Sequence, residues 1–173
     1  IKTGSPMKEV LDYYKNNILI SDVIQKLGLE KDKYFLVSTH REENIEPREN
    51  LKEIVSILNS LADLYSFPIV VSTHPRTAKK LLELGESISD EIKFHKPFGF
   101  FDYINLQINS YCVISDSGTI TEESSILNFP ALNLREVHER PEGAEEGTVV
   151  MTGLNKKMVL SSIEIVRRQK EHI

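Results

Sequence analysis

Residues 111–119, with the sequence YCVISDSGT, decide the fold of this chain. Four residues that suit a buried strand are followed at once by a polar turn that contains a glycine. Residues 119–128 then show the apolar spacing of a helix. A strand, a tight turn and a helix in this order form the unit from which α/β domains are built.

The same unit recurs along the whole chain. Strand-like runs occupy residues 34–37, 68–71, 92–94, 111–114, 131–134 and 148–151, and helical patterns occupy residues 6–18, 23–27, 47–65, 78–82, 101–110, 119–128 and 155–170. Strands that alternate with helices of this kind specify a parallel sheet with right-handed crossovers and helices on both faces. The sequence predicts one doubly wound α/β domain over residues 1–173.

The composition excludes several classes of protein. The chain has 173 residues, and its 21 Lys and Arg against 26 Asp and Glu give a net charge of -5, so we expect no nucleic acid or membrane partner. No apolar run approaches the roughly 18 residues of a membrane span, which predicts a soluble chain. A single cysteine, Cys112, excludes a disulfide framework and fits the cytoplasm. We expect no metal site and no cofactor.

The first four residues, IKTG, contain no basic and apolar leader. They resemble the tail of a strand that enters a loop. We therefore expect the chain to be a fragment of a larger polypeptide.

Polar clusters follow the predicted strands, where ligands bind in parallel sheets. These clusters are His40-Arg41, His74-Pro75-Arg76, Ser115 to Gly118, and Arg135 to Arg140. Arginine can hold phosphate through two nitrogens, and histidine can transfer a proton near neutral pH. Each histidine could equally be a hydrogen-bonded loop residue, and residues 135–142 could be a solvated loop. Two His and Arg pairs on one edge favour anion binding.

The turn at residues 115–119 has the features of a diphosphate cradle. Gly118 lets a ligand approach the backbone, and the positive end of the following helix attracts phosphate. Neither a G-x-G-x-x-G fingerprint nor a P-loop is present. The alternative is that Ser117 merely caps the helix.

Two further features can complete a nucleotide site. Glu123 stands about 7 to 8 Å along the helix, where its carboxylate can accept protons from a ribose diol. Alternatively, Glu122 and Glu123 only favour an early helical turn through the macrodipole. Residues 98–103, FGFFDY, contain four aromatics, which are either core or a surface on which a base stacks.

Assembled in this order, the segments resemble the C-terminal half of a non-hydrolysing UDP-N-acetylglucosamine 2-epimerase. The segments that carry the resemblance are THREEN at 39–44, SDSGTITEE at 115–123 and ERPEG at 139–143. Segments 72–77, 96–103 and 127–131 look most like the branch that forms UDP-N-acetyl-L-fucosamine for capsule or O-antigen. The resemblance implies a Rossmann-like domain, the C-terminal half of a glycosyltransferase-B type two-domain fold.

The resemblance also implies roles for individual residues. His40 is the catalytic candidate beside the diphosphate and sugar, next to Arg41. Ser117, Gly118 and Thr119 would bind the phosphates, although the family's second glycine is Thr119 here. The remaining implied roles are ribose binding by Glu123, stacking on uracil by Tyr103 beside Phe98, diphosphate binding by Arg135 and a possible effector site at His74.

The implied reaction inverts carbon 2 of the sugar by elimination and re-addition of UDP, without metal or redox cofactor. The carboxylates that handle the proton lie in the family's N-terminal domain, so we expect this chain to bind UDP but not to turn over. Full-length relatives are dimers. The sequence leaves open a glycosyltransferase donor domain and a non-catalytic nucleotide-sugar sensor.

Overall fold

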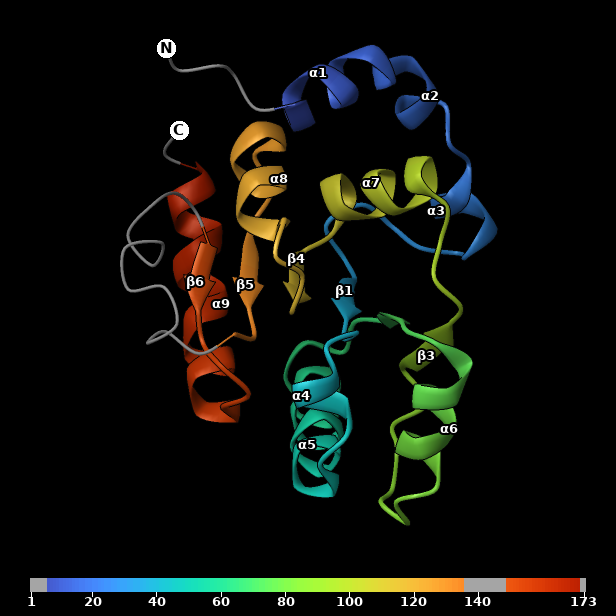
Figure 1. Ribbon diagram of the computed structural model, residues 1–173, viewed down its shortest axis with the longest axis vertical. Coiled ribbons are helices and arrows are strands. Elements are labelled where there is room, and N and C mark those ends of the chain that lie inside the picture. Colours follow the sequence, from blue (N-terminus) through green and yellow to red (C-terminus); the bar gives the residue numbers. More distant parts are fainter. Residues whose placement is uncertain (1–5, 136–148, 172–173) are drawn as a thin grey trace.

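A computed structural model describes residues 6–135 and 149–171 of the chain (Figure 1). Its strands form one parallel sheet in the order β3-β2-β1-β4-β5-β6. The strands are β1 Phe35–Ser38, β2 Ile69–Ser72, β3 Ile92–His95, β4 Cys112–Ser115, β5 Ala131–Asn133 and β6 Val149–Met151. This order is that of a doubly wound, Rossmann-like sheet, which confirms the predicted fold class.

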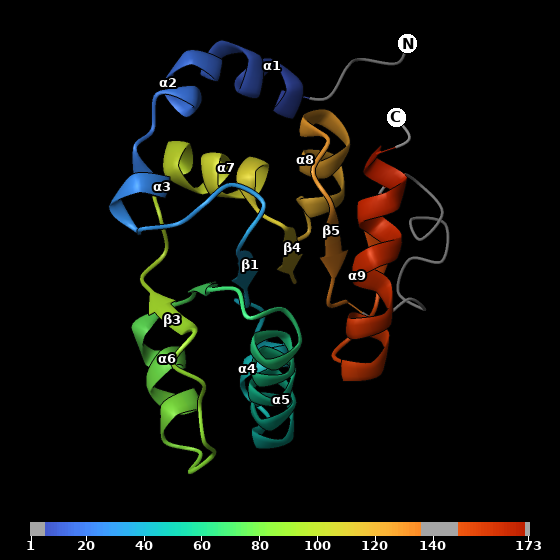
Figure 2. The ribbon, with the colours of Figure 1, turned by 180° about the vertical axis from the view of Figure 1, so that it is seen from behind.

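The helices cover both faces of the sheet. They are α1 Pro6–Tyr13, α2 Lys15–Leu19, α3 Val23–Lys26, α4 Glu42–Ile45, α5 Arg48–Tyr65, α6 Pro75–Leu82, α7 Phe100–Asn109, α8 Ile120–Leu127 and α9 Lys156–Glu171. One core cluster joins α5, α6 and α9 to one face, and a second joins α3, α7 and α8 to the other. Helices α1 and α2 lie outside α7 and α8 as a further layer (Figures 1 and 2).

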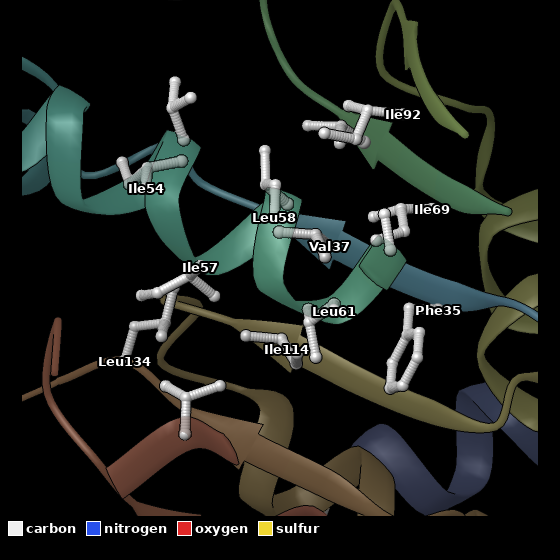
Figure 3. Close-up of a cluster of buried hydrophobic side chains, with 14 of the residues drawn as sticks. Phe35, Val37, Ile54, Ile57, Leu58, Leu61, Ile69, Ile92, Ile114 and Leu134 are labelled. Carbon is white, nitrogen blue, oxygen red and sulfur yellow. The ribbon is translucent and has the colours of Figure 1, made fainter. Parts of the chain in front are cut away.

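Consecutive strand residues serve opposite cores, because strand side chains alternate between the two faces of a sheet. Phe35 and Val37 pack under α5, whereas Leu36 packs on the side of α7. Figure 3 shows Leu58 and Leu61 of α5 pointing toward these strand side chains. All four positions of β1 are buried, which explains why the sequence shows a continuous apolar run rather than alternation.

The polar residue after each of three apolar runs also belongs to the strand. Ser38 pairs in register with Ser72 on one side and with Ser115 on the other, and all three are buried. The prediction that the strands end at Val37, Val71 and Ile114 was therefore wrong by one residue. The sequence suggested a loop because serine is common in turns, but here the ladder continues through each serine.

The expected single helix over residues 6–18 is two helices. Tyr14, with φ -96° and ψ 11°, separates α1 from α2. Its ring packs against Phe101 at a centroid distance of 5.3 Å. Leu11 and Ile18, on either side of the break, join Ile104 in a third small core. Among the described residues, no helix is long and apolar enough to cross a membrane.

Truncation of a leucine on α5 tests this packing. Leu61 is 0% exposed and Leu64 is 65% exposed on the same helix. We expect Leu61→Ala to lower the free energy of unfolding by about 3 kcal/mol, because it leaves a cavity in the core under β1. Leu64→Ala is the matched control and should change it by less than about 0.5 kcal/mol. Denaturant titration followed by circular dichroism measures both, and equal losses would contradict the assigned orientation of α5.

Candidate functional site

The candidate site lies between β1 and β4, where the order of the strands in the sheet changes direction. β1 and β4 are neighbours, but α5 covers one face after β1 and α8 covers the other after β4. The two connections diverge there and leave a crevice beyond the carboxyl ends of the strands. The residues that follow β1 and β4 include most of the predicted site residues.

A row of polar side chains runs across this edge of the sheet. Each strand from β3 to β5 contributes one polar residue that pairs in register with the next: His95, Ser72, Ser38, Ser115 and Asn133. Tyr103 on α7 lines the crevice together with Ser38. Burial raises the pKa of Tyr103 to about 12, so the phenol keeps its proton at neutral pH. Tyr103 thus brings a neutral hydroxyl and an aromatic ring to this edge of the sheet.

Asp116 joins the exit of β4 to the exit of β1. Its carboxylate is 1% exposed and accepts hydrogen bonds from the backbone N–H groups of His40 (3.0 Å) and Arg41 (3.0 Å). The side-chain amide of Asn44 donates a third hydrogen bond, also at 3.0 Å. The backbone N–H of Asp116 in turn donates to the carbonyl of Ser38. These contacts hold the His40 loop against the turn that precedes α8.

The turn before α8 presents its backbone to solvent. Ser117 is half-buried, and Gly118 and Thr119 are exposed. The Ser117 hydroxyl accepts from the Thr119 N–H at 3.2 Å, within the turn. The N-cap residue of α8 is Thr119, and no side-chain hydrogen bond caps the helix, so the alternative that Ser117 caps it was wrong. The first turn of any helix has N–H groups without partners inside the helix, and these can face a ligand.

Arg135 stands beside this turn. A Cβ built on Gly118 would lie 3.6 Å from Nη1 of Arg135, so the guanidinium lies next to the glycine. Asn133 sets this arrangement, since its Oδ1 accepts from the Arg135 N–H at 3.0 Å and its Nδ2 donates to the Ser117 carbonyl at 3.4 Å. A cation and a helix start thus face the same exposed backbone.

Glu123 lies one helical turn further along α8 and is 9% exposed. One carboxylate oxygen accepts from Thr119 Oγ1 at 3.1 Å, and the other accepts from Gln107 Nε2 at 3.0 Å. Burial raises the pKa of Glu123, while the hydrogen bonds from Gln107 and Thr119 act in the opposite direction. A carboxylate can accept about four hydrogen bonds, so each oxygen retains acceptor capacity.

A cleft of about 190 Å³ gathers several predicted site residues. His40, Phe98, Tyr103 and Ser117 line it, together with Ser38, Ser72 and Pro97. Phe98 packs on the ring of His95 with centroids 5.4 Å apart. Burial lowers the pKa of His95, which therefore stays neutral near pH 7. The cleft thus combines an aromatic wall with a row of hydroxyl groups.

Six predicted residues lie outside the lining of this cleft: Arg41, His74, Gly118, Thr119, Glu123 and Arg135. His74 is the N-cap of α6, where its Nδ1 accepts from the Arg76 N–H at 3.1 Å. The Nε of Arg41 pairs with Glu43 at 3.3 Å, and its Nη1 is buried without a hydrogen-bond partner in the described residues. The segment 139–143 and Arg140 lie outside the described residues.

Sequence reasoning assigned no role to Asp116, Asn133 or Gln107. Asn133 follows directly on an apolar run and Asp116 follows one after a single serine, which is a usable signal at the carboxyl edge of a parallel sheet. Gln107 had no signal, because it lies in the last turn of α7 and belongs to no motif. Residues 6–135 and 149–171 contain no group of three or more His, Cys, Asp or Glu side chains placed to hold a metal ion.

Similarity to known proteins identifies the family of the chain. The sequence model of the family described as UDP-N-acetylglucosamine 2-epimerase matches residues 1–173. The chain belongs to this family. A curated UDP-N-acetylglucosamine 2-epimerase of Methanocaldococcus jannaschii is 35% identical over 147 residues, which are 82% of this chain and 40% of the relative.

Solved structures of family members agree. The UDP-N-acetylglucosamine 2-epimerase of Rickettsia bellii is 46% identical with a TM-score of 0.81, covering 95% of this chain and 44% of that one. The M. jannaschii enzyme in complex with UDP-GlcNAc and UDP is 30% identical with a TM-score of 0.81, covering 96% of this chain and 47% of that one.

The chain therefore spans less than half the length of these family members. Its six-stranded sheet and its likeness to their structures confirm the expectation of a Rossmann-like half of a glycosyltransferase-B type fold. The shared half includes the crevice described above.

Replacement of Asp116 tests whether this carboxylate holds the edge together. Asp116→Ala leaves three donors unpaired, so we expect the free energy of unfolding to fall by about 3 kcal/mol. Asp116→Asn retains one acceptor oxygen and should lose less. Asp90→Ala, at an exposed carboxylate, is the control and should stay within about 0.5 kcal/mol of the unsubstituted chain. Urea titration measures all three, and an Asp116→Ala variant as stable as the control would disprove the role.

Proposed function

We propose that this chain is the UDP-binding half of a cytoplasmic UDP-N-acetylhexosamine 2-epimerase, an isomerase that acts in surface polysaccharide synthesis. The observation that supports it most strongly is the convergence of the exposed turn at Ser117 to Thr119, the cation of Arg135 and the carboxylate of Glu123 on α8. A related enzyme has been solved with UDP-GlcNAc and UDP.

The diphosphate would lie over Gly118. Its negative charge is favoured by the N–H groups and positive end of α8 and by Arg135. A glycine at this position has no side chain between phosphate and backbone, and Arg135 is 3.6 Å from where one would begin. Thr119, which replaces the family's second glycine, is exposed and directs its hydroxyl to Glu123. The threonine therefore does not have to cover the amides that face the phosphate.

The ribose would bind at Glu123, whose two oxygens are already oriented by Gln107 and Thr119. The uracil would enter the cleft bounded by Phe98 and Tyr103. Both rings line the cleft, and an aromatic ring in such a place is a good stacking surface. Stacking of the uracil on Tyr103 stays a prediction.

His40 would act at the sugar end of the diphosphate, with Arg41 beside it. Its side chain is exposed at the cleft, while its backbone is fixed by Asp116. Elimination of UDP develops charge on the leaving diphosphate, and donors held in place before the reaction stabilise that charge.

The carboxylates that move the C2 proton would come from an N-terminal domain of the same polypeptide, and the complete enzyme would be a homodimer. Two further points stay predictions: that the enzyme belongs to the branch that forms UDP-N-acetyl-L-fucosamine, and that an effector binds at His74.

Nucleotide binding can be tested on Glu123 with a neighbouring control. Glu123→Gln removes a charged acceptor for the ribose hydroxyls, so we expect the Kd for UDP to rise about tenfold or more. The folded-state pKa of Glu123 is raised, so its ionised form destabilises the fold at neutral pH, and this penalty disappears as pH falls through that pKa. The Gln variant should thus be at least as stable as the parent at pH 7.

Glu122→Gln removes a half-buried carboxylate one position away and should leave the UDP affinity within about twofold. Calorimetric titration with UDP measures affinity, and thermal unfolding measures stability. Equal UDP affinity in all three proteins would rule out the assigned ribose contact. Loss of both affinity and stability in Glu123→Gln would indicate a purely structural carboxylate.

Turnover is the second test. Because the proton-transferring carboxylates are assigned to another domain, we expect the 173-residue chain to bind UDP-GlcNAc without exchanging its C2 proton in D2O. Proton NMR of the sugar over hours measures the exchange. Measurable deuterium uptake would refute the division of roles between the two halves, and transfer of the sugar to an acceptor would favour a glycosyltransferase instead.

A further inference from the structure

The end of the sheet opposite the crevice contains a second cavity, of about 470 Å³. The loop before β1 forms one side, the C-terminal ends of α7 and α8 another, and the last turn of α9 a third. The ends of α8 and α9 lie side by side there in both ribbon views (Figures 1 and 2). The proposed nucleotide site uses none of these residues.

Three cations line this cavity: Lys31, Arg167 and Lys170. Within residues 6–135 and 149–171, no carboxylate lies within ion-pair distance of any of them, although Asp32 and Glu171 also line the cavity. By contrast Lys33, two positions from Lys31, pairs with Glu30 at 3.1 Å. The three cations outnumber the two carboxylates in the lining, and none of the three is in an ion pair with a described residue.

Arg167 is held in a fixed orientation. Its Nη1 donates to the Tyr111 carbonyl at 2.6 Å, and its guanidinium lies 3.7 Å from the centre of the Tyr111 ring. Glu164 accepts from the Tyr111 hydroxyl and so fixes the ring from its other end. A guanidinium has five N–H donors, so an immobilised Arg167 still has donors for an incoming group.

Lys170 is half-buried, and burial lowers its pKa to about 8. Arg167 and Lys31 lower it further through repulsion, and Asp32 acts in the opposite direction. The fourth titratable neighbour is the thiol of Cys112 on β4, which is uncharged near pH 8 because burial raises its pKa to about 12. An anion placed between these cations would relieve the repulsion.

We propose that this cavity binds a small phosphate monoester, with the phosphate held by Lys31, Arg167 and Lys170. The volume lies within the range of small-molecule pockets and exceeds what a bare phosphate fills. Asn128, which lines the cavity beside Asp32, offers an amide for hydroxyl groups of the organic part, and Ile108 and Leu127 supply apolar walls. The ligand class is a phosphorylated polyol or sugar, bound at the opposite end of the sheet from the nucleotide.

Site-resolved NMR of the 173-residue chain provides the test, because phosphates can also bind at Gly118. Glucose 6-phosphate, inorganic phosphate and glucose are titrated separately at pH 7. We expect glucose 6-phosphate to shift the amides of Asp32, Asn128 and Lys170 along one saturating curve, more tightly than inorganic phosphate, while glucose has no effect. Shifts confined to residues 117–119 would overturn the proposal.

Lys170→Met should weaken the shifts at Asp32 and Asn128 about tenfold or more and leave those at residues 117–119 unchanged. Arg168→Gln removes one positive charge at an exposed position of α9 two residues from Lys170 and is the matched control, with an expected change below about twofold. Equal weakening of glucose 6-phosphate binding by both variants would show that the affinity depends on the net charge of the chain and not on Lys170, which would overturn the proposal. Thermal unfolding confirms that each variant is folded.

The pH dependence gives an independent readout. Between pH 7 and 9.5 Lys170 loses its proton, so affinity for glucose 6-phosphate should fall severalfold in the unsubstituted chain. Lys170→Arg keeps its charge throughout and should bind equally at both pH values. An equal fall in affinity for Lys170→Arg and for the unsubstituted chain would show that Lys170 does not bind the phosphate.

Discussion

Asp116 is a buried carboxylate at the point where the sheet changes direction, and the crevice depends on it. The loops that leave β1 and β4 diverge to opposite faces, and past the paired Ser38 and Ser115 one backbone hydrogen bond, from Asp116 to the Ser38 carbonyl, continues the contact. The hydrogen bonds that the Asp116 carboxylate accepts from His40, Arg41 and Asn44 extend this link to the His40 loop. A single charged acceptor satisfies two main-chain donors and one side chain, which an apolar residue cannot do.

A buried charge normally destabilises a fold, and this edge contains two of them. Asp116 is offset by several short hydrogen bonds, whereas Glu123 receives only two, and burial raises its pKa. Their different surroundings suit different roles. Asp116 has its acceptors occupied by the protein and acts on the loop, while Glu123 retains acceptor capacity for a ligand. Gln107 orients Glu123, and Asn133 orients the backbone of Arg135 and Ser117.

The two ends of the sheet are both electropositive in places, for different reasons. At the carboxyl end, the start of α8 and Arg135 present donors next to an exposed glycine. At the amino end, Lys31, Arg167 and Lys170 meet because the ends of three separate segments converge around one cavity. The first arrangement is encoded within a few consecutive residues, but the second arises from residues about 140 positions apart, which come together only in the folded chain.

The sequence by itself determined the α/β class, the strand order along the chain and the position of the turn before α8, because each follows from local spacing: apolar runs, a glycine and a following helix. It also indicated His40, Ser117 and Glu123 as candidates, since each lies just past a strand or in the first turns of a helix, and the family resemblance added Phe98; their roles stay predictions. Only the tertiary structure decided that three serines continue the ladder and that Tyr14 splits the first helix. It alone showed the role of Asp116, because that role depends on partners more than 70 residues away. Local pattern specifies what a segment prefers, but which buried polar groups become partners depends on how the strands are ordered in the sheet.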